Sequence, residues 1–270
     1  DGLFRCASAE ATLLAALDRG VEIVGGIPHF ERTMAEGARS VERLCAIAAE
    51  RGLRVDMHCD ETDDPMSRHV ETLAFEALKR GLVGRVTGSH LTSMHGMDDY
   101  YVSKLIPLIA EAEMTVIANP AVNAMIQGRH DGYPTRRGLT RVPELREGGL
   151  TVAFGSDCMM DPWYPLGAGD MLDVALIGAH MLHAAGLDAM RACFDAVTVD
   201  AAAVMGLDGY GLAEGARADM VLLQAGDPIE AMRLRAPRLA VIRGGAVVAE
   251  SAPRETRLAQ GGRTIRPDRL

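Results

Sequence analysis

The segment LRVDMHCDETDDPMSRHVETLAFEALKRG (53–81) contains one complete strand-and-helix unit. Its first part, LRVDMH (53–58), has the apolar and β-branched content of a buried strand, and a polar loop follows it. After Ser67, a residue type that favours a helix start, apolar side chains recur at helical spacing until Gly81, a typical helix end. The segment therefore predicts a strand, a loop and an amphipathic helix, with Ser67 as the helix cap.

The same order recurs on both sides of this segment. Four other strand candidates are VEIVGGIP (21–28), GRVTGSH (84–90), MTVIANP (114–120) and LTVAFGSD (150–157). The helices expected after the five strands cover residues 38–51, 67–81, 98–112, 141–147 and 170–185. Pro107 is expected to kink or restart the third helix. Strands that alternate with helices indicate a parallel sheet, and five units are a little more than half of an eight-unit (β/α) barrel.

The pattern changes after about residue 207. Three short strands are expected there, in ADMVLLQ (218–224), RLAVIR (238–243) and AVVAE (246–250). Gly244-Gly245 between the last two is a two-residue hairpin signal. We therefore expect part of a barrel over residues 1–207, and a small β-appendage with a surface tail over residues 208–270.

Composition excludes several classes of protein. The chain has 270 residues and a net charge of -9, with no basic run of the kind that binds nucleic acid. No apolar stretch approaches the length of about 18 residues that spans a membrane. The five cysteines form no C-x-x-C pair, which indicates a reducing compartment and a cytoplasmic protein. The start, DGLFRCASAE (1–10), has neither an initiating Met nor a signal-peptide pattern, so we expect residues before it.

Polar residues able to bind a metal lie where the expected strands end. His58, His90, Asn119 and Asp157 close the second to fifth strands. Because the carboxyl ends of barrel strands form the active-site face, these side chains can converge. Two imidazoles and a carboxylate suit zinc or iron. A single His is more often a hydrogen-bonded loop residue and a single Asp a helix cap, but three such ends in successive units favour a metal site.

Glu61 follows His58 by three residues, at the mouth of the expected barrel. A carboxylate there can reach a metal-bound water and move protons to and from it. The alternative is that Glu61, with Asp60, Asp63 and Asp64, forms a solvated acidic loop.

Several long motifs resemble one family. They are VGGIPHFERT (24–33), DMHCDETDDPMSR (56–68), GSHLTSMH (88–95), NP-x-x-N (119–123), QGRHDGYPTRRG (127–138) and FGSDCMMDPWYPLG (154–167). Together they resemble the bacterial cytosine deaminases of the amidohydrolase superfamily, from about residue 20 to the β-appendage. The H-x-E and P-C-x-x-C signature of the small zinc cytidine deaminases is absent from the sequence.

The resemblance implies a TIM-like amidohydrolase (β/α)8 barrel, of which this chain supplies the fourth to eighth strands, plus the β-appendage. It implies one divalent metal ion, zinc or iron, with His58 and Asp157 among its ligands. Glu61 would shuttle protons, and His90 would hydrogen-bond the attacking water and bind the substrate. Trp163 would line the base pocket, although the single tryptophan of a chain is often just buried core.

The chain departs from the family pattern at two places. The paired H-x-H ligands are missing, since no two of the eight histidines lie two residues apart, and we expect them before residue 1. Two ligands alone would hold the metal weakly. Cys158 stands where relatives that act on cytosine have a second Asp, which removes a charge, opens space beside the ring and favours 5-methylcytosine. A nucleophilic Cys158 is the weaker alternative, because the expected chemistry uses metal-bound water.

The sequence therefore predicts a metal-dependent deaminase of cytosine or a cytosine-like base that releases ammonia. Its catalytic residues would be Glu61, His90 and Asp157, and Cys158, Trp163 and His90 would bind the substrate. We expect a small-molecule base as its partner and a homo-oligomer as its assembly. The alternatives are a hydrolase of another cyclic amidine, such as isoguanine, creatinine or a triazine, and a truncated scaffold without catalysis.

Overall fold

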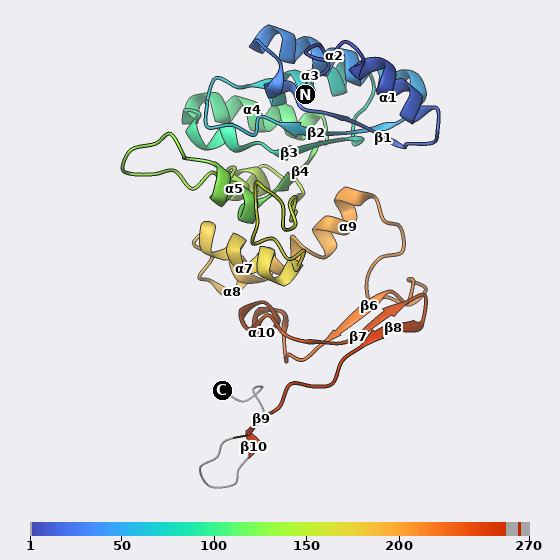
Figure 1. The fold of residues 1–270 in the computed structure, drawn as a ribbon, viewed down its shortest axis with the longest axis vertical. Coiled ribbons are helices and arrows are strands. Elements are labelled where there is room, and N and C mark those ends of the chain that lie inside the picture. Colours follow the sequence, from blue (N-terminus) through green and yellow to red (C-terminus); the bar gives the residue numbers. More distant parts are fainter. Residues whose placement is uncertain (1, 258–263, 266–270) are drawn as a thin grey trace. The chain divides into compact units, whose positions relative to one another are not determined.

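The computed structural model describes residues 2–257 and 264–265 (Figure 1). The chain divides into two compact units, Asp1–Gly169 and Asp170–Leu270. The division expected from the sequence at residue 207 falls inside the second unit and stays a prediction.

The first unit is built on a parallel sheet of five strands. They are β1 (Ile23–Gly26), β2 (Arg54–Cys59), β3 (Val86–His90), β4 (Thr115–Ala118) and β5 (Val152–Phe154). Each strand pairs in parallel with the next one along the chain, in the order β1-β2-β3-β4-β5. All five expected strands are present, and their sequential order is that of a barrel rather than of a doubly wound sheet.

Six α-helices accompany this sheet. They are α1 (Ala9–Leu17), α2 (Met34–Arg51), α3 (His69–Lys79), α4 (Asp99–Glu111), α5 (Pro120–Ile126) and α6 (Val142–Glu147), with short 3-10 turns η1 (Pro28–Phe30) and η2 (Thr92–Gly96). Figure 1 shows α2, α3 and α4 on the same side of the sheet, and each of the three contacts its neighbour. The sequence did not predict α1 or α5.

Helix α4 continues through Pro107, so the helix does not restart there, and the expected kink stays a prediction. An internal proline costs a helix roughly 3 kcal/mol. Val102, Leu105 and Ile109 lie on both sides of Pro107 and are at most 4% exposed. Burying each such side chain contributes about 1.5–3 kcal/mol, so tertiary packing outweighs the cost of the proline.

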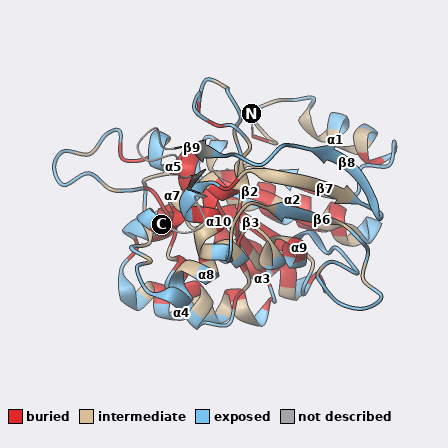
Figure 2. Ribbon diagram, turned by 90° about the horizontal axis from the view of Figure 1, so that it is seen from below, coloured by how far each residue is buried: buried red, intermediate tan, exposed pale blue. Residues whose placement is uncertain are grey.

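The core lies between this sheet and its helices. All five residues of β3 are buried, although its sequence VTGSH contains polar residues. Strands of a parallel sheet are usually covered on both faces. On α2, the helically spaced Val41, Leu44, Cys45 and Ala48 are at most 2% exposed. In Figure 2, α3 and α4 likewise alternate between buried and exposed positions around each turn.

The start of α3 differs from expectation. Ser67 does not cap the helix: its hydroxyl donates to Asp60 Oδ1 at 2.7 Å, and Arg68 is the N-cap residue. The cap comes from Asp60, whose carboxylate accepts the backbone N–H groups of His69 at 3.1 Å and Val70 at 2.8 Å. A buried carboxylate satisfies two otherwise unpaired helix N–H groups better than a hydroxyl does, which explains the difference.

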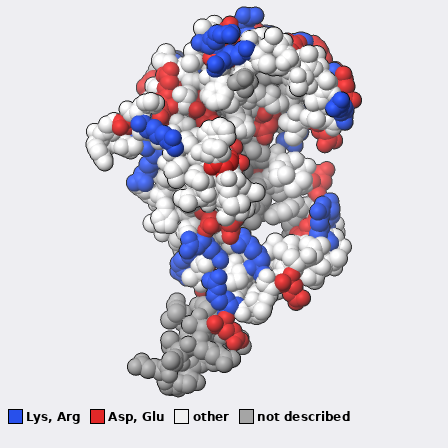
Figure 3. All heavy atoms as spheres, in the orientation of Figure 1, with Lys and Arg blue, Asp and Glu red and all other residues white. Residues whose placement is uncertain are grey.

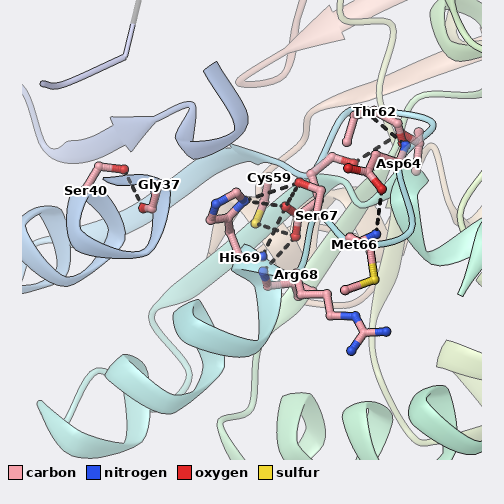
Figure 4. Close-up of polar contacts among 12 residues, drawn as sticks. Gly37, Ser40, Cys59, Thr62, Asp64, Met66, Ser67, Arg68 and His69 are labelled. Atoms are coloured by element: carbon pink, nitrogen blue, oxygen red, sulfur yellow. Dashed lines mark hydrogen bonds and ion pairs between the residues drawn. The ribbon is translucent and has the colours of Figure 1, made fainter. Parts of the chain in front are cut away.

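Asp60 also binds the ring of His69. Figure 4 shows the dashed polar contacts of Ser67 and His69. The His69 Nδ1 atom lies 2.7 Å from Asp60 Oδ1, and both side chains are buried. Burial alone raises the pKa of Asp60, but hydrogen bonds from His69, Ser67 and Val70 outweigh it and lower the pKa below its usual range. The carboxylate is therefore ionised in the folded protein.

Gly37 on α2 lets this cluster pack against the helix. A Cβ at Gly37 would lie 2.1 Å from His69 Nε2 and 2.7 Å from the Pro28 carbonyl oxygen. Only a glycine fits this close approach. The Asp60–Ser67–His69 cluster thus joins the end of β2 and the start of α3 to the backbone of α2.

The second unit contains four helices and the β-appendage. They are α7 (Met171–Met181), α8 (Leu187–Asp195), α9 (Val199–Met205) and α10 (Pro228–Leu234), with strands β6 (Met220–Leu223), β7 (Arg238–Arg243), β8 (Ala246–Glu250), β9 (Thr256–Arg257) and β10 (Thr264–Ile265). Strands β6, β7 and β8 form an antiparallel sheet, and Gly244-Gly245 turns β7 into β8 with positive φ at both residues, as expected. Arg238 binds both carboxylate oxygens of Asp170, the residue that caps α7.

Acidic and basic side chains both occur on each unit in the face seen in Figure 3. In the part of the chain that the structure describes, no helix has the length and apolarity needed to cross a membrane.

The clasp by Asp60 can be tested by Asp60→Asn in the full-length protein. At pH 7 we expect a loss of about 3 kcal/mol in the free energy of unfolding, because an amide cannot accept all the hydrogen bonds that Cys59, Ser67, His69 and Val70 make to Asp60 and leaves buried donors unpaired. Asp64→Asn in the same loop is the control, since Asp64 is exposed and its single backbone bond can be kept by an amide oxygen.

The pH dependence of this difference follows from the lowered pKa of Asp60. The folded-state pKa lies below the unfolded value, so the stabilisation is complete above about pH 4 and is lost as the pH falls through the folded value. Urea unfolding of both proteins at neutral and acidic pH measures this. Equal stability of wild type and Asp60→Asn at pH 7 would contradict the role of the clasp.

Candidate active site and metal centre

Three strand ends bring potential metal ligands together. His58 is the penultimate residue of β2, His90 is the last residue of β3, and Asp157 follows β5 by three residues. The Asp157 Oδ1 atom lies 3.5 Å from His58 Nε2 and 4.0 Å from His90 Nε2. The potential ligand atoms of the three residues all lie within 4.8 Å of one another. Strand ends of one parallel sheet thus place residues 99 positions apart in one cluster.

The backbone is unusual at the same places. Asp60, His90, Leu91 and Asp157 all have positive φ, at 52°, 74°, 51° and 59°. For a residue with a side chain, this left-handed conformation costs roughly 1–2 kcal/mol, and it concentrates at functional sites. These positive-φ residues lie at or just after the carboxyl ends of β2, β3 and β5.

Electrostatics distinguish the hydrogen-bonded pair of His58 and Asp157 from the ring of His90. The hydrogen bond with Asp157 raises the pKa of His58, and the same bond lowers the pKa of Asp157. Burial lowers the pKa of His90 to about 4, although the charge of Asp157 opposes this. Asp157 is therefore an ionised carboxylate beside a neutral His90.

His90 is fully buried and is surrounded by amides. Its Nδ1 atom lies 3.2 Å from Asn119 Nδ2 and 3.1 Å from Asn123 Nδ2. Its Nε2 atom, also buried, has no hydrogen-bond partner among the residues that the structure describes. Asn119 was expected at a strand end, whereas Asn123 stood in the N-P-x-x-N motif without a predicted role. The spacing of this motif places both side chains on one helix face.

Glu61 lies in this cluster rather than in solvent. Its Oε1 atom is 3.1 Å from His90 Nδ1 and accepts a hydrogen bond of 3.0 Å from Asn123 Nδ2, and the side chain is 12% exposed. Burial, together with the charge of Asp157, raises the pKa of Glu61 to about 7. A carboxyl group with such a pKa is half protonated near neutrality, which suits a group that both gives and takes protons. These contacts weigh against the solvated-loop alternative.

Cys158 lies beside Asp157, and its thiol donates a hydrogen bond of 3.5 Å to Asp157 Oδ2. Burial raises the pKa of the Cys158 thiol to about 12, and the Asp161 and Asp157 carboxylates act in the same direction. The thiol is therefore neutral, which weighs against a nucleophilic role.

Trp163 is 61% exposed, so it is not a core residue. Its backbone N–H donates to Asp161 Oδ1, as does that of Tyr164, in a tight turn of the D-P-W-Y segment. The role of Trp163 in a base pocket stays a prediction.

The residues present fit a divalent metal ion. In the described residues, the group of metal-binding side chains is His58, His90 and Asp157, two imidazoles and a carboxylate. This donor set suits zinc or iron. The unpartnered, buried Nε2 atom of His90 is also what a site built around an additional group would show.

The fold is shared with solved deaminases and hydrolases. Over 95% of this chain, the structure of a 5-methylcytosine deaminase from Klebsiella pneumoniae is 41% identical, with a TM-score of 0.92. Over 92% of it, an N-isopropylammelide isopropylaminohydrolase from Burkholderia multivorans is 28% identical, with a TM-score of 0.81. These matches cover 62% and 60% of the two solved chains.

A curated relative, the pterin deaminase of Rhizobium rhizogenes, is 32% identical over 216 residues. That match covers 79% of this chain and 49% of the relative, so the chain spans about half of that protein's length. Residues 2–252 match the model of the amidohydrolase family, which is nearly the whole chain. With its sequential parallel strands and its cluster at their ends, the chain belongs to the amidohydrolase family.

Proposed function

We propose that the protein containing this chain removes an amino group from a cytosine-like base by metal-dependent hydrolysis. The observation that carries the proposal is the cluster of Glu61, His90 and Asp157, in which a carboxyl group with a pKa of about 7 lies next to an ionised carboxylate and a neutral imidazole. Similarity to a solved 5-methylcytosine deaminase over 95% of the chain supports the choice of substrate.

His58 and Asp157 would hold the metal ion, zinc or iron. When bound, such an ion lowers the pKa of water toward neutrality. The ionised state of Asp157 suits both roles that the proposal gives it, as a ligand and as the acceptor of the water proton. The ligand role of His58 fits its place at the exposed end of β2.

Glu61 would carry protons to and from the substrate. With a pKa raised to about 7, it can protonate the ring nitrogen beside the amino-bearing carbon and later take the proton of the added hydroxyl, while Asp157 passes the water proton to the amino group that leaves as ammonia. His90 would hydrogen-bond the oxygen that adds to this carbon and steady the tetrahedral intermediate. Glu61 and His90 both contact Asn123, which holds their two side chains next to each other.

Cys158 would set the preference among bases. A neutral thiol next to Asp157 leaves no second negative charge beside the ring, and it accepts a methyl group as a mildly apolar neighbour. Trp163 would cover the base from the exposed D-P-W-Y segment. We therefore favour 5-methylcytosine over cytosine.

There are two alternative functions, and the relatives support only the first. The pterin deaminase and the isopropylammelide hydrolase among the relatives keep other cyclic amidines, such as isoguanine, creatinine or a triazine, as candidate substrates. A scaffold without catalysis fits less well, because it gives no reason for a strained, half-protonated Glu61–His90 cluster. We also propose a cytoplasmic protein, because the cysteines of the sequence form no C-x-x-C pair, and a homo-oligomeric assembly.

The role of Glu61 can be tested by Glu61→Gln in the full-length protein. The amide keeps the shape and can keep a bond to Asn123 but cannot exchange protons, so we expect kcat to fall by about 10²–10⁴-fold with the metal content unchanged. Ammonia release and elemental analysis measure the two quantities. Glu22→Gln, at an exposed position, is the control and should keep wild-type turnover. Near-normal kcat in Glu61→Gln would return this residue to the acidic-loop alternative.

The role of Cys158 can be tested by comparing kcat/KM for 5-methylcytosine and cytosine. We expect wild type to use 5-methylcytosine at least as well as cytosine, and Cys158→Asp to reverse the order, because one methyl group in a fitted pocket is worth about 1–3 kcal/mol. Cys158→Ser is the matched control: it is small and neutral, so the preference for the methylated base should survive. A strong wild-type preference for cytosine, or an unchanged ratio in Cys158→Asp, would show that Cys158 does not select the base.

A further inference from the structure

The chain contains two asparagines, Asn119 and Asn123, and both contact the same imidazole. They are 3% and 0% exposed, and His90 between them is fully buried. Burying two primary amides costs free energy unless their hydrogen bonds are made. Their placement therefore calls for a reason beyond the packing of α5.

Asn119 is not used as a helix cap. It occupies the N-cap position of α5, where an asparagine side chain ordinarily accepts a backbone N–H of the first turn. Here it makes no such bond to any described backbone group, and its Nδ2 atom lies 3.2 Å from His90 Nδ1 instead. The α5 helix gives up a common stabilising contact so that the amide can reach the imidazole.

Gly155 makes room for this arrangement. A Cβ at Gly155, just after β5, would lie 2.3 Å from Asn119 Oδ1 and 3.0 Å from the Ile117 side chain. The backbone of Gly155 is held there by its N–H bond to the Ala118 carbonyl. The amide of Asn119 is thus confined between the ends of β4 and β5.

Asn123 fixes the direction of the second amide. Its Nδ2 atom donates to Glu61 Oε1 at 3.0 Å, so the NH₂ group of Asn123, and not its carbonyl, faces this carboxyl group. The same Nδ2 atom lies 3.1 Å from His90 Nδ1, closer than Asn123 Oδ1 at 3.3 Å. His90 Nδ1 therefore faces the NH₂ groups of two amides, and a ring nitrogen that faces donors is an acceptor.

We propose that Asn119 and Asn123 are positioning residues that hold neutral His90 in the tautomer with its proton on Nε2. The Nε2 atom is the one without a partner in the described chain, and it lies 4.0 Å from Asp157 Oδ1. An N–H there is a fixed, buried donor toward the metal centre. The tautomer stands on geometry alone, whereas its use in steadying the added oxygen rests on the proposed function.

The proton of the His90 ring has one competing position. The His90 Nδ1 atom also lies 3.1 Å from Glu61 Oε1, so a proton on Nδ1 could be shared with that carboxylate. In that arrangement Nε2 would be a bare acceptor and the amides would not set the tautomer. The two arrangements differ only in which ring nitrogen carries the hydrogen.

Long-range ¹H–¹⁵N NMR spectroscopy on ¹⁵N-histidine-labelled, full-length, metal-loaded protein distinguishes them. The His90 signals are identified by their loss in His90→Gln. We expect a protonated Nε2 and an unprotonated Nδ1 in wild type, without substrate. A proton on Nδ1 in wild type would overturn the proposal, whatever the reaction of the enzyme is.

Asn119→Asp tests the cause, because a carboxylate in place of the amide accepts where the amide donates. We expect the His90 proton to move to Nδ1 and kcat to fall about 10²-fold, the usual cost of losing one donor to the reacting oxygen, with KM changed much less. Gln127→Glu is the control, an amide-to-carboxylate change at the end of the same helix, and it should leave the tautomer as in wild type.

Three outcomes are then distinct. A wild-type tautomer in Asn119→Asp, or the same tautomer shift in Gln127→Glu, would overturn the positioning role. The expected tautomers without any loss of turnover in Asn119→Asp would overturn the use of the Nε2 donor. Expected tautomers in a protein that deaminates no pyrimidine would leave the positioning role standing and overturn the proposed function alone.

Discussion

The site depends on the ionised carboxylate of Asp60, buried where β2 turns into its loop. It accepts hydrogen bonds from the hydroxyl of Ser67, the ring of His69 and two backbone N–H groups of α3, which ties the end of β2, where His58 and Glu61 lie, to the start of α3. A buried charge is tolerated only when it is fully hydrogen-bonded, and that requirement determines both the start of α3 and the glycine on α2. Two of the residues proposed to carry the chemistry, His58 and Glu61, lie on the segment that Asp60 holds in place.

His90 has the complementary position at the end of β3. Its buried ring lies between the amides of α5 and the carboxylate of Asp157, and Asn123 connects it to Glu61. The proton carrier and the neutral imidazole are therefore oriented by one shared amide. Such pre-organised polar groups cost free energy when the chain folds, and they recover it only where charge develops during a reaction.

The fold of this chain is shared with solved relatives whose names give different substrates. The sheet and its helices superimpose on solved relatives that act on different rings, at TM-scores of 0.92 and 0.81. Our proposal assigns the choice among bases to Cys158, whose raised pKa keeps it neutral beside Asp157. Within one barrel, exchanging one side chain at a strand end can change the substrate without changing the core.

The sequence by itself determined the five strands, the buried face of α2 and the polar residues at the strand ends, because hydrophobic periodicity and barrel topology are local and repetitive signals. It did not predict that α4 would continue through Pro107, that Asp60 rather than Ser67 would cap α3, or that Asn123 would join Glu61 to His90. Each of these depends on a balance between a local preference and contacts with residues far away in the chain. Only the tertiary structure decides that balance, because burial determines whether a proline inside a helix, a buried carboxylate or a buried amide is stable there.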